Sequence, residues 1–121
     1  MIINQNEIHI FRTSTDLNEN ELNSFRKNLS DDENTKAERY KFNYLKNNYT
    51  ACRGFLREIL SGYTGINPSD IKFSYSKFGK PFLKDSNIRF NVSHSGNTGI
   101  IAVNLENELG IDIELVREVP D

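Results

Sequence analysis

The sequence contains a single cysteine and no tryptophan among its 121 residues. Because Cys52 has no second cysteine as a partner, it cannot form an intrachain disulfide, which favours a reducing compartment. No apolar run approaches the roughly 20 residues that a membrane-spanning helix needs. The first residues, Met1 to Phe11, also lack the apolar core of a secretory signal. These absences predict a soluble protein of the cytoplasm.

The sequence also has little excess charge of either sign. Its 15 lysines and arginines are offset by 17 aspartates and glutamates, which gives a net charge of −2. This balance argues against general attraction to nucleic acid or to an anionic membrane. An anionic ligand would therefore have to be held by a local cluster of cations or by a metal ion.

Proline and glycine are sparse, with 3 and 7 residues, and neither is concentrated in one segment. The sequence shows no internal repeat of fixed period and no window with the composition of a disordered tail. A length of 121 residues fits one small domain, and an apolar fraction of 36% predicts a thin core. We therefore expect residues 1–121 to form a single domain.

The pattern of apolar residues predicts strands and helices in a definite order. Alternation or short apolar runs predict strands, whereas apolar residues three or four apart predict helices. The expected elements are a strand within residues 2–11, a short helix within 16–28, one or two helices between 31 and 63, and strands at 71–75, 88–92, 99–103 and 110–116. This order predicts an α+β fold, with an antiparallel sheet of about four to five strands and helices packed on it.

Capping signals mark the boundaries of the long helical stretch. Ser30 followed by Glu33 is a capping-box pattern and predicts a helix start. Gly62 and Gly65 are candidate stop signals. Both one long helix and two shorter helices fit this stretch, because asparagines interrupt it at Asn43, Asn47 and Asn48.

The strand predicted at residues 110–116 carries two carboxylates, Asp112 and Glu114. Because successive side chains of a strand point to opposite faces, both lie on one face, roughly 7 Å apart along the strand. Such carboxylates can converge on one Mg²⁺ ion, which typically takes one or two protein carboxylates together with water and substrate phosphates. The pair predicts a metal–diphosphate site, although an amphipathic strand with a solvated polar face explains the same tripeptide.

The segment Asn91–Gly96 follows a predicted strand and combines small hydroxyl residues with a histidine and a glycine. We expect a turn whose backbone N–H groups and hydroxyls approach a phosphate, with His94 as a further donor. A covalent nucleophile at Ser93 or Ser95 is less favoured, because no G-x-S-x-G elbow is present and the other histidine, His9, lies in the first predicted strand. A solvated turn histidine without a ligand is the alternative.

Several basic side chains are candidates for contact with an anion. Lys80 lies in a Gly-Lys-Pro turn, where the following proline favours an extended backbone near the predicted sheet. Lys36 and Arg39 are three residues apart on a predicted helix and can share one face. Arg53 and Arg57 follow in the same helical stretch. For each of these residues, a solvated surface cation is the alternative.

Together, four ordered blocks of this sequence resemble the Sfp-type 4′-phosphopantetheinyl transferases. The blocks are the helical segment Lys36–Phe42 with Ala51–Arg57, the turn Phe78–Pro81, the segment Phe90–Gly96 and the strand Gly110–Glu114. Their order and spacing are similar to the family pattern over most of the chain. The resemblance implies that the chain is one half of a pseudo-duplicated fold, in which two similar halves enclose an active site.

The resemblance also implies a reaction, a substrate and a metal. The reaction is transfer of 4′-phosphopantetheine from coenzyme A to a serine of an acyl, peptidyl or polyketide carrier protein, with release of 3′,5′-ADP. Asp112 and Glu114 would be the catalytic residues and would bind Mg²⁺ at the coenzyme A diphosphate. The residues implied in coenzyme A binding are Lys36, Lys80, Ser93 and His94, with the histidine at the 3′-phosphate.

The chain departs from the family pattern in one respect. The second half of such transferases carries a Trp-x-x-Lys-Glu block, which supplies another metal-site carboxylate and a lysine, and this sequence has no tryptophan. The resemblance therefore implies that residues 1–121 are the amino-terminal half, with the carboxy-terminal half absent. Alternatively, the half associates with itself, as in the homo-oligomeric holo-acyl-carrier-protein synthases of the superfamily. A non-catalytic module that binds coenzyme A or a carrier protein is the competing function.

Overall fold

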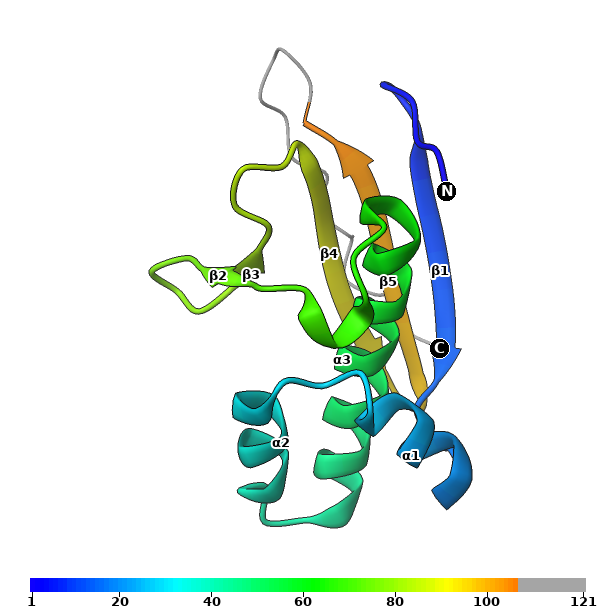
Figure 1. Ribbon diagram of the computed structural model, residues 1–121. Coiled ribbons are helices and arrows are strands. Elements are labelled where there is room, and N and C mark those ends of the chain that lie inside the picture. Colours follow the sequence, from blue (N-terminus) through cyan, green and yellow to red (C-terminus); the bar gives the residue numbers. More distant parts are fainter. Residues whose placement is uncertain (107–121) are drawn as a thin grey trace.

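The computed structural model describes residues 1–106, which form helices and antiparallel sheets. In chain order the elements are β1 (Ile8–Ser14), α1 (Glu19–Arg26), α2 (Asp31–Glu38), α3 (Asn43–Thr64), the 3-10 helix η1 (Pro68–Asp70), β2 (Ser74–Tyr75), β3 (Pro81–Phe82), β4 (Ile88–Ser95) and β5 (Thr98–Leu105). Figure 1 shows α3 crossing one face of the sheet, with α1 and α2 near one of its ends and the β2–β3 hairpin projecting on the side of β4. The predicted α+β class is confirmed.

The main sheet places β5 between β1 and β4, and both neighbours run antiparallel to it. The prediction of a buried strand at 99–103 is confirmed, because residues 101–104 of β5 are all buried. The first strand begins later than predicted, at Ile8. Its Phe11 packs against the core, whereas Ile8 and Ile10 alternate with it and are exposed.

Within residues 1–106, the strands are divided between two sheets rather than joined in one. Three strands form the main sheet, and β2 and β3 form a separate two-stranded hairpin. The strand predicted at 71–75 is shorter in the structure, where Ser74 and Tyr75 alone pair with β3. The strand predicted at 110–116 lies outside the described residues.

The long helical stretch consists of two helices, and the break precedes the asparagines that made it plausible. α2 ends at Glu38, and residues 39–42 lead into α3, whose first residue is Asn43. Phe42, at the N-cap of α3, has an extended backbone with φ −114° and ψ 141°. This break allows α2 to fold back beside the first half of α3 (Figure 1).

The capping signals read from the sequence are present at both ends of this stretch. The Glu33 N–H donates to Ser30 Oγ at 3.2 Å, and the Ser30 N–H donates to Glu33 Oε1 at 3.1 Å. At the other end, Gly65 adopts φ 76° and caps α3, a left-handed conformation that favours glycine. Gly62 lies inside α3, so the prediction of a stop there was wrong.

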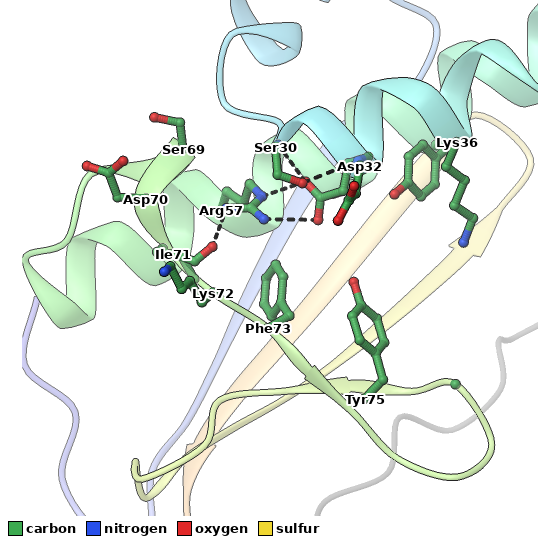
Figure 2. A pocket seen from close by; sticks show the side chains of 13 residues that line it. Ser30, Asp32, Lys36, Arg57, Ser69, Asp70, Ile71, Lys72, Phe73 and Tyr75 are labelled. Carbon is green, nitrogen blue, oxygen red and sulfur yellow. Dashed lines mark hydrogen bonds and ion pairs between the residues drawn. The ribbon is translucent and has the colours of Figure 1, made fainter.

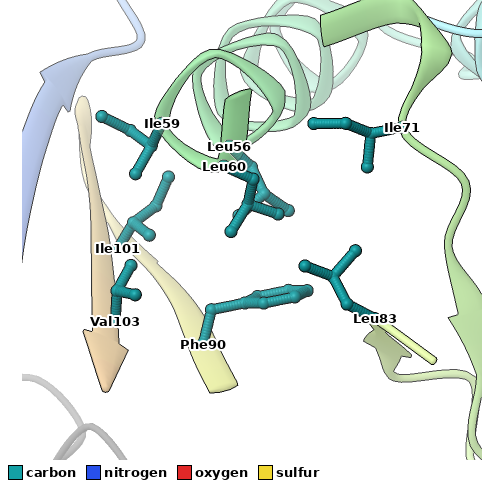
Figure 3. Close-up of a cluster of buried hydrophobic side chains, with 8 residues drawn as sticks. All are labelled: Leu56, Ile59, Leu60, Ile71, Leu83, Phe90, Ile101 and Val103. Atoms are coloured by element: carbon teal, nitrogen blue, oxygen red, sulfur yellow. The ribbon is translucent and has the colours of Figure 1, made fainter. Parts of the chain in front are cut away.

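The core lies between α3 and the main sheet. Figure 3 shows its buried side chains, which are Leu56, Ile59, Leu60, Ile71, Leu83, Phe90, Ile101 and Val103. α1 approaches α3 closely at Gly54, where an added Cβ would lie 2.5 Å from Phe25 Cβ, so this contact requires glycine. The apolar face of α3 is thus directed at the sheet.

None of the helices in residues 1–106 is long and apolar enough to cross a membrane.

Candidate functional site

A pocket of about 780 Å³ opens between α2, α3 and the chain that leads from η1 into the hairpin. Figure 2 shows the rings of Phe73 and Tyr75 pointing from this chain toward α2, which carries Lys36. Charged side chains of both signs also line the pocket, including Asp32 and Lys72. A ligand with both charged and aromatic parts fits such a lining.

One wall of this pocket contains a buried carboxylate that two arginines share. Arg57 donates to Glu33 through Nε at 2.7 Å and Nη2 at 3.0 Å, and Arg53 Nη1 donates at 2.6 Å. The Glu33 and Arg57 side chains are only 6% and 2% exposed. Burial alone would raise the pKa of Glu33, but hydrogen bonds from Arg57, the Ser30 N–H and Arg53 lower it below its ordinary value. Glu33 is therefore ionised at neutral pH.

The two arginines also contact the segment from η1 to β2, which forms the opposite side of the pocket. Arg57 Nη1 donates to the carbonyl oxygens of Pro68 and Ile71, both at 2.7 Å. Arg53 Nη1 donates to the Tyr75 hydroxyl at 3.0 Å. The Glu33–Arg53–Arg57 network therefore joins α2 and α3 to η1 and to the β2–β3 hairpin.

Lys36 lies in the last turn of α2 and is exposed. Its Nζ lies 5.0 Å from the centroid of the Tyr49 ring, within the range of a cation–π contact. Tyr49 also packs against Tyr40, with ring centroids 5.6 Å apart. Burial raises the pKa of Tyr49 to about 12, so its hydroxyl remains neutral. Lys36 thus presents a positive charge at the mouth of the 780 Å³ pocket.

Lys80 lies in the hairpin turn, as predicted, and is tied to the main sheet. Its Nζ donates to Asn91 Oδ1 at 2.6 Å, and its backbone N–H donates to Ser76 Oγ at 3.1 Å. Lys80 and Asn91 line a second pocket of about 230 Å³ between the hairpin and β4. An ammonium carries three donors, so the bond to Asn91 leaves Lys80 able to bind an anion.

Ser93 and His94 lie in a strand, and the prediction of a turn at this segment was wrong. The residues up to Ser95 belong to β4, and Gly96 with Asn97 forms the turn to β5. The strand persists because each of its residues pairs with β5, with His94 opposite Gly99. Pairing with β5 occupies alternate backbone groups of this segment, and its side chains are the candidate contacts for phosphate.

The pocket beside His94 has a volume of about 230 Å³ and includes Ser93, Tyr40, Tyr49 and Cys52 in its lining. Burial raises the pKa of the Cys52 thiol to about 11, so the thiolate is scarce at neutral pH. A cysteine in this state is a poor nucleophile. The pocket is therefore suited to binding rather than to covalent catalysis through Cys52.

Tyr49 lines two pockets that together contain three of the residues predicted to bind coenzyme A. It lines both the pocket that contains Lys36 and the pocket that contains Ser93 and His94. Lys80 bonds to the same strand that carries Ser93 and His94. The structure thus gathers the predicted binding side chains around α2, α3, β4 and the hairpin, although they line separate pockets.

The predicted metal ligands, Asp112 and Glu114, lie outside the described residues. Within residues 1–106, no three side chains of His, Cys, Asp or Glu are grouped in a way that could hold a metal ion. The donor set proposed for Mg²⁺ therefore rests on the chemistry of the Asp-Ile-Glu sequence, whose carboxylate oxygens are ligands that this cation prefers.

The Glu33–Arg53–Arg57 network is the main feature of this region that the sequence does not predict. The sequence pattern indicates candidate anion contacts or solvated cations at Arg53 and Arg57, and a capping residue at Glu33. Their spacing of four places both arginines on one face of a helix, a signal that indicates a shared partner. The identity of that partner depends on how α2 folds back, which spacing along the chain does not specify.

A family model described as "4'-phosphopantetheinyl transferase, N-terminal" matches residues 16–106, more than half of the chain. A solved holo-(acyl-carrier-protein) synthase from Bacillus anthracis has a similar fold, with a TM-score of 0.63 over 81% of this chain and 93% of that chain. The two sequences are 22% identical, so this likeness concerns the fold alone. It agrees with the predicted half of a phosphopantetheinyl transferase fold.

Two relatives extend the comparison. The chain is 41% identical over 120 residues to 4'-phosphopantetheinyl transferase HetI of Nostoc sp., covering 96% of this chain and 51% of HetI. It is 37% identical over 65 residues to 4'-phosphopantetheinyl transferase Sfp of Bacillus subtilis, covering 53% of this chain and 29% of Sfp. The chain thus spans about half the length of HetI. It belongs to the 4'-phosphopantetheinyl transferase family and corresponds to the N-terminal region of that family.

Proposed function

We propose that the protein containing this chain transfers the 4′-phosphopantetheine group of coenzyme A to a serine of a carrier protein. The family match, together with HetI and Sfp as transferases of this name, supports the proposal. The related fold of the Bacillus anthracis synthase was solved in complex with CoA (3',5'-ADP), which supports coenzyme A as the ligand. Carriers of fatty-acid, polyketide or nonribosomal-peptide synthesis, in the cytoplasm, are the proposed partners.

The observation that carries this proposal is the arrangement of cations and aromatic rings around Tyr49. Lys36 Nζ lies over the Tyr49 ring, and Tyr49 also lines the pocket that contains His94. Coenzyme A combines an adenine ring with a diphosphate and a 3′-phosphate, so its binding site needs aromatic or apolar surface beside several donors. In a protein of net charge −2, these local donors have to supply the attraction for the anion.

Each predicted binding residue has a defined role in this proposal. The ammonium groups of Lys36 and Lys80 bind phosphate oxygens through charge-assisted hydrogen bonds. His94 donates to the 3′-phosphate, and the Ser93 hydroxyl supplies a further hydrogen bond. Because these groups hold the nucleotide part of coenzyme A, they orient the diphosphate for attack.

The transfer itself takes place at the β-phosphorus of coenzyme A. The carrier serine Oγ gives up its proton to a base and forms a bond to this phosphorus, the bond to the bridging oxygen breaks, and 3′,5′-ADP leaves with that oxygen. Asp112 and Glu114 are the proposed ligands of Mg²⁺, which when bound supplies charge neutralisation at the diphosphate. The remaining metal-site groups would come from a carboxy-terminal half or from a self-association partner.

The intact mass of a carrier protein tests this function. The full chain is incubated with coenzyme A, Mg²⁺ and an apo carrier, and addition of one phosphopantetheine arm is the expected product of a complete site. Asp112→Ala should abolish the addition. Glu58→Ala, which removes an exposed carboxylate of α3, should leave it unchanged. If Asp112→Ala adds the phosphopantetheine arm to the carrier as fully as Glu58→Ala does, the proposed role of Asp112 is contradicted.

A binding module without turnover is the second candidate, because Lys36, Ser93 and His94 line pockets within the described residues. In that case calorimetry would detect coenzyme A binding by the full chain, and the mass of the carrier would not change. An absence of binding by the full chain would contradict the binding module.

A further inference from the structure

The Glu33–Arg53–Arg57 network takes no part in the proposed transfer chemistry, yet it connects the two elements that carry Lys36 and Lys80. Its polar groups are well matched within the described part of the chain. The Glu33 carboxylate accepts from both guanidinium groups and from the Ser30 N–H, at distances from 2.6 to 3.1 Å. A buried arrangement of this kind has one favoured geometry, because each displaced group would leave an unpaired charge.

On the side of α2, the network fixes the turn that carries Lys36. Glu33 lies three residues before Lys36, so nearly one helical turn separates them. The bond from Arg57 to Glu33 holds this part of α2 against α3, the helix that carries Tyr49. The position of the Lys36 ammonium above Tyr49 therefore depends on the network.

On the side of the hairpin, the network fixes the strand opposite Lys80. Tyr75, which accepts from Arg53, pairs with Pro81, the residue that follows Lys80. β2 and β3 have two residues each, and within residues 1–106 they pair only with one another. A two-stranded hairpin is marginally stable without further contacts, so its orientation depends on anchors such as the Arg53–Tyr75 bond.

We propose that Arg53, held in place by Glu33, is a positioning residue for coenzyme A: through Tyr75 it fixes the β2–β3 hairpin so that Lys80 and Lys36 face the same bound ligand. This inference rests on the proposed function, because it assumes that both lysines bind phosphate. The physical gain is preorganisation. A hairpin already ordered in the unliganded protein does not have to be ordered by the ligand, and affinity rises accordingly.

The test removes the anchor without disturbing the core. Tyr75→Phe deletes the hydroxyl that accepts from Arg53, and the Tyr75 side chain is half exposed. We expect the dissociation constant for coenzyme A or 3′,5′-ADP, measured by calorimetry on the full chain, to rise about two- to tenfold, as for one lost hydrogen bond. The Ser76 and Gly79 amides, which bond within the hairpin turn, should exchange with deuterium faster. The thermal midpoint should stay unchanged.

Tyr44→Phe is the matched control, because Tyr44 is an exposed tyrosine at the start of α3, away from the hairpin. It should change neither affinity nor exchange. Wild-type affinity in Tyr75→Phe would overturn the positioning role, whether or not hairpin exchange is faster. If the wild-type chain binds no coenzyme A, the proposed phosphate-binding role of Lys36 and Lys80 fails instead. Amide exchange of Tyr75→Phe still tests whether the Arg53–Tyr75 bond holds the hairpin. Exchange as slow as in the wild type would overturn that part of the proposal as well.

Discussion

The two ends of α2 hold the same kind of ion pair in opposite surroundings. At the start of the helix, Glu33 is 6% exposed and is shared by Arg57 and Arg53. At its end, Glu38 is 67% exposed and lies 2.8 Å from Lys46 Nζ. Both glutamates bond to a basic residue of α3, and the pKa of each is lowered. The pairs differ in solvation and in the number of additional bonds.

This difference indicates which pair determines the structure. Removing charges from water is costly, so a buried pair is stable only where geometry and further hydrogen bonds compensate for the lost hydration. Glu33 meets this condition through several donors, and Arg57 meets it through the carbonyls of Pro68 and Ile71. An exposed pair is screened by water and salt and contributes little. The end of α2 near Glu33 therefore anchors the site.

The largest effect is expected for Arg57→Ala. This change leaves Glu33 with one arginine and removes the donor to the Pro68 and Ile71 carbonyls. Loss of one partner from a buried pair typically costs about 3–5 kcal/mol. Urea unfolding of the full chain, followed by circular dichroism, measures the change in the free energy of unfolding.

Arg26→Ala is the control for this measurement. Arg26 lies in the last turn of α1, and its guanidinium is 3.8 Å from the exposed carboxylate of Glu19. Loss of such a surface pair should cost no more than about 1 kcal/mol. Similar losses for Arg57→Ala and Arg26→Ala would contradict the view that burial distinguishes the Glu33 pair.

A smaller effect, dependent on pH, is expected for Glu33→Gln. Because the folded-state pKa of Glu33 is below its ordinary value of 4.5, the ionised carboxylate stabilises the fold fully above that value. This stabilisation is lost as the pH falls through the folded-state pKa. The substituted amide would keep the shape of the side chain but would not ionise. The deficit of the variant should thus be largest near neutral pH and shrink as the pH falls below 4.5, measured by urea unfolding at each pH.

Glu38→Gln is the matched variant at the other end of α2. The hydrogen bond and charge of Lys46 lower the pKa of Glu38, but its side chain is exposed, so the deficit at neutral pH should be much smaller. A deficit of Glu33→Gln that stays constant over the whole pH range would show that its ionisation does not stabilise the fold.

Much of this architecture follows from local patterns that are visible in the sequence. The capping box at Ser30, the left-handed cap at Gly65 and the buried strand β5 were predicted because each depends on neighbouring residues. The two-helix arrangement remained open, because the break at residues 39–42 has no strong local signal. The turn predicted around Ser93 was wrong, since pairing with β5 extended the strand.

The site was predictable in its residue types but not in its supporting contacts. Lys80 was expected in a turn near the sheet, and the structure has it there, but the bond from its Nζ to Asn91 links residues 11 apart. The Arg57–Glu33 contact links residues 24 apart, and it depends on tertiary packing.

The smallest effect is expected for Lys46→Ala, the variant that breaks the pair with the exposed Glu38 carboxylate at the end of α2. Lys46 Nζ lies 2.8 Å from Glu38 Oε2, as short as the bonds in the buried network, but both water and salt compete for these charges. The urea midpoint should therefore match that of the wild type at low and at high salt. A loss as large as that of Arg57→Ala would mean that bond length, rather than burial with additional donors, determines the contribution of an ion pair on α2.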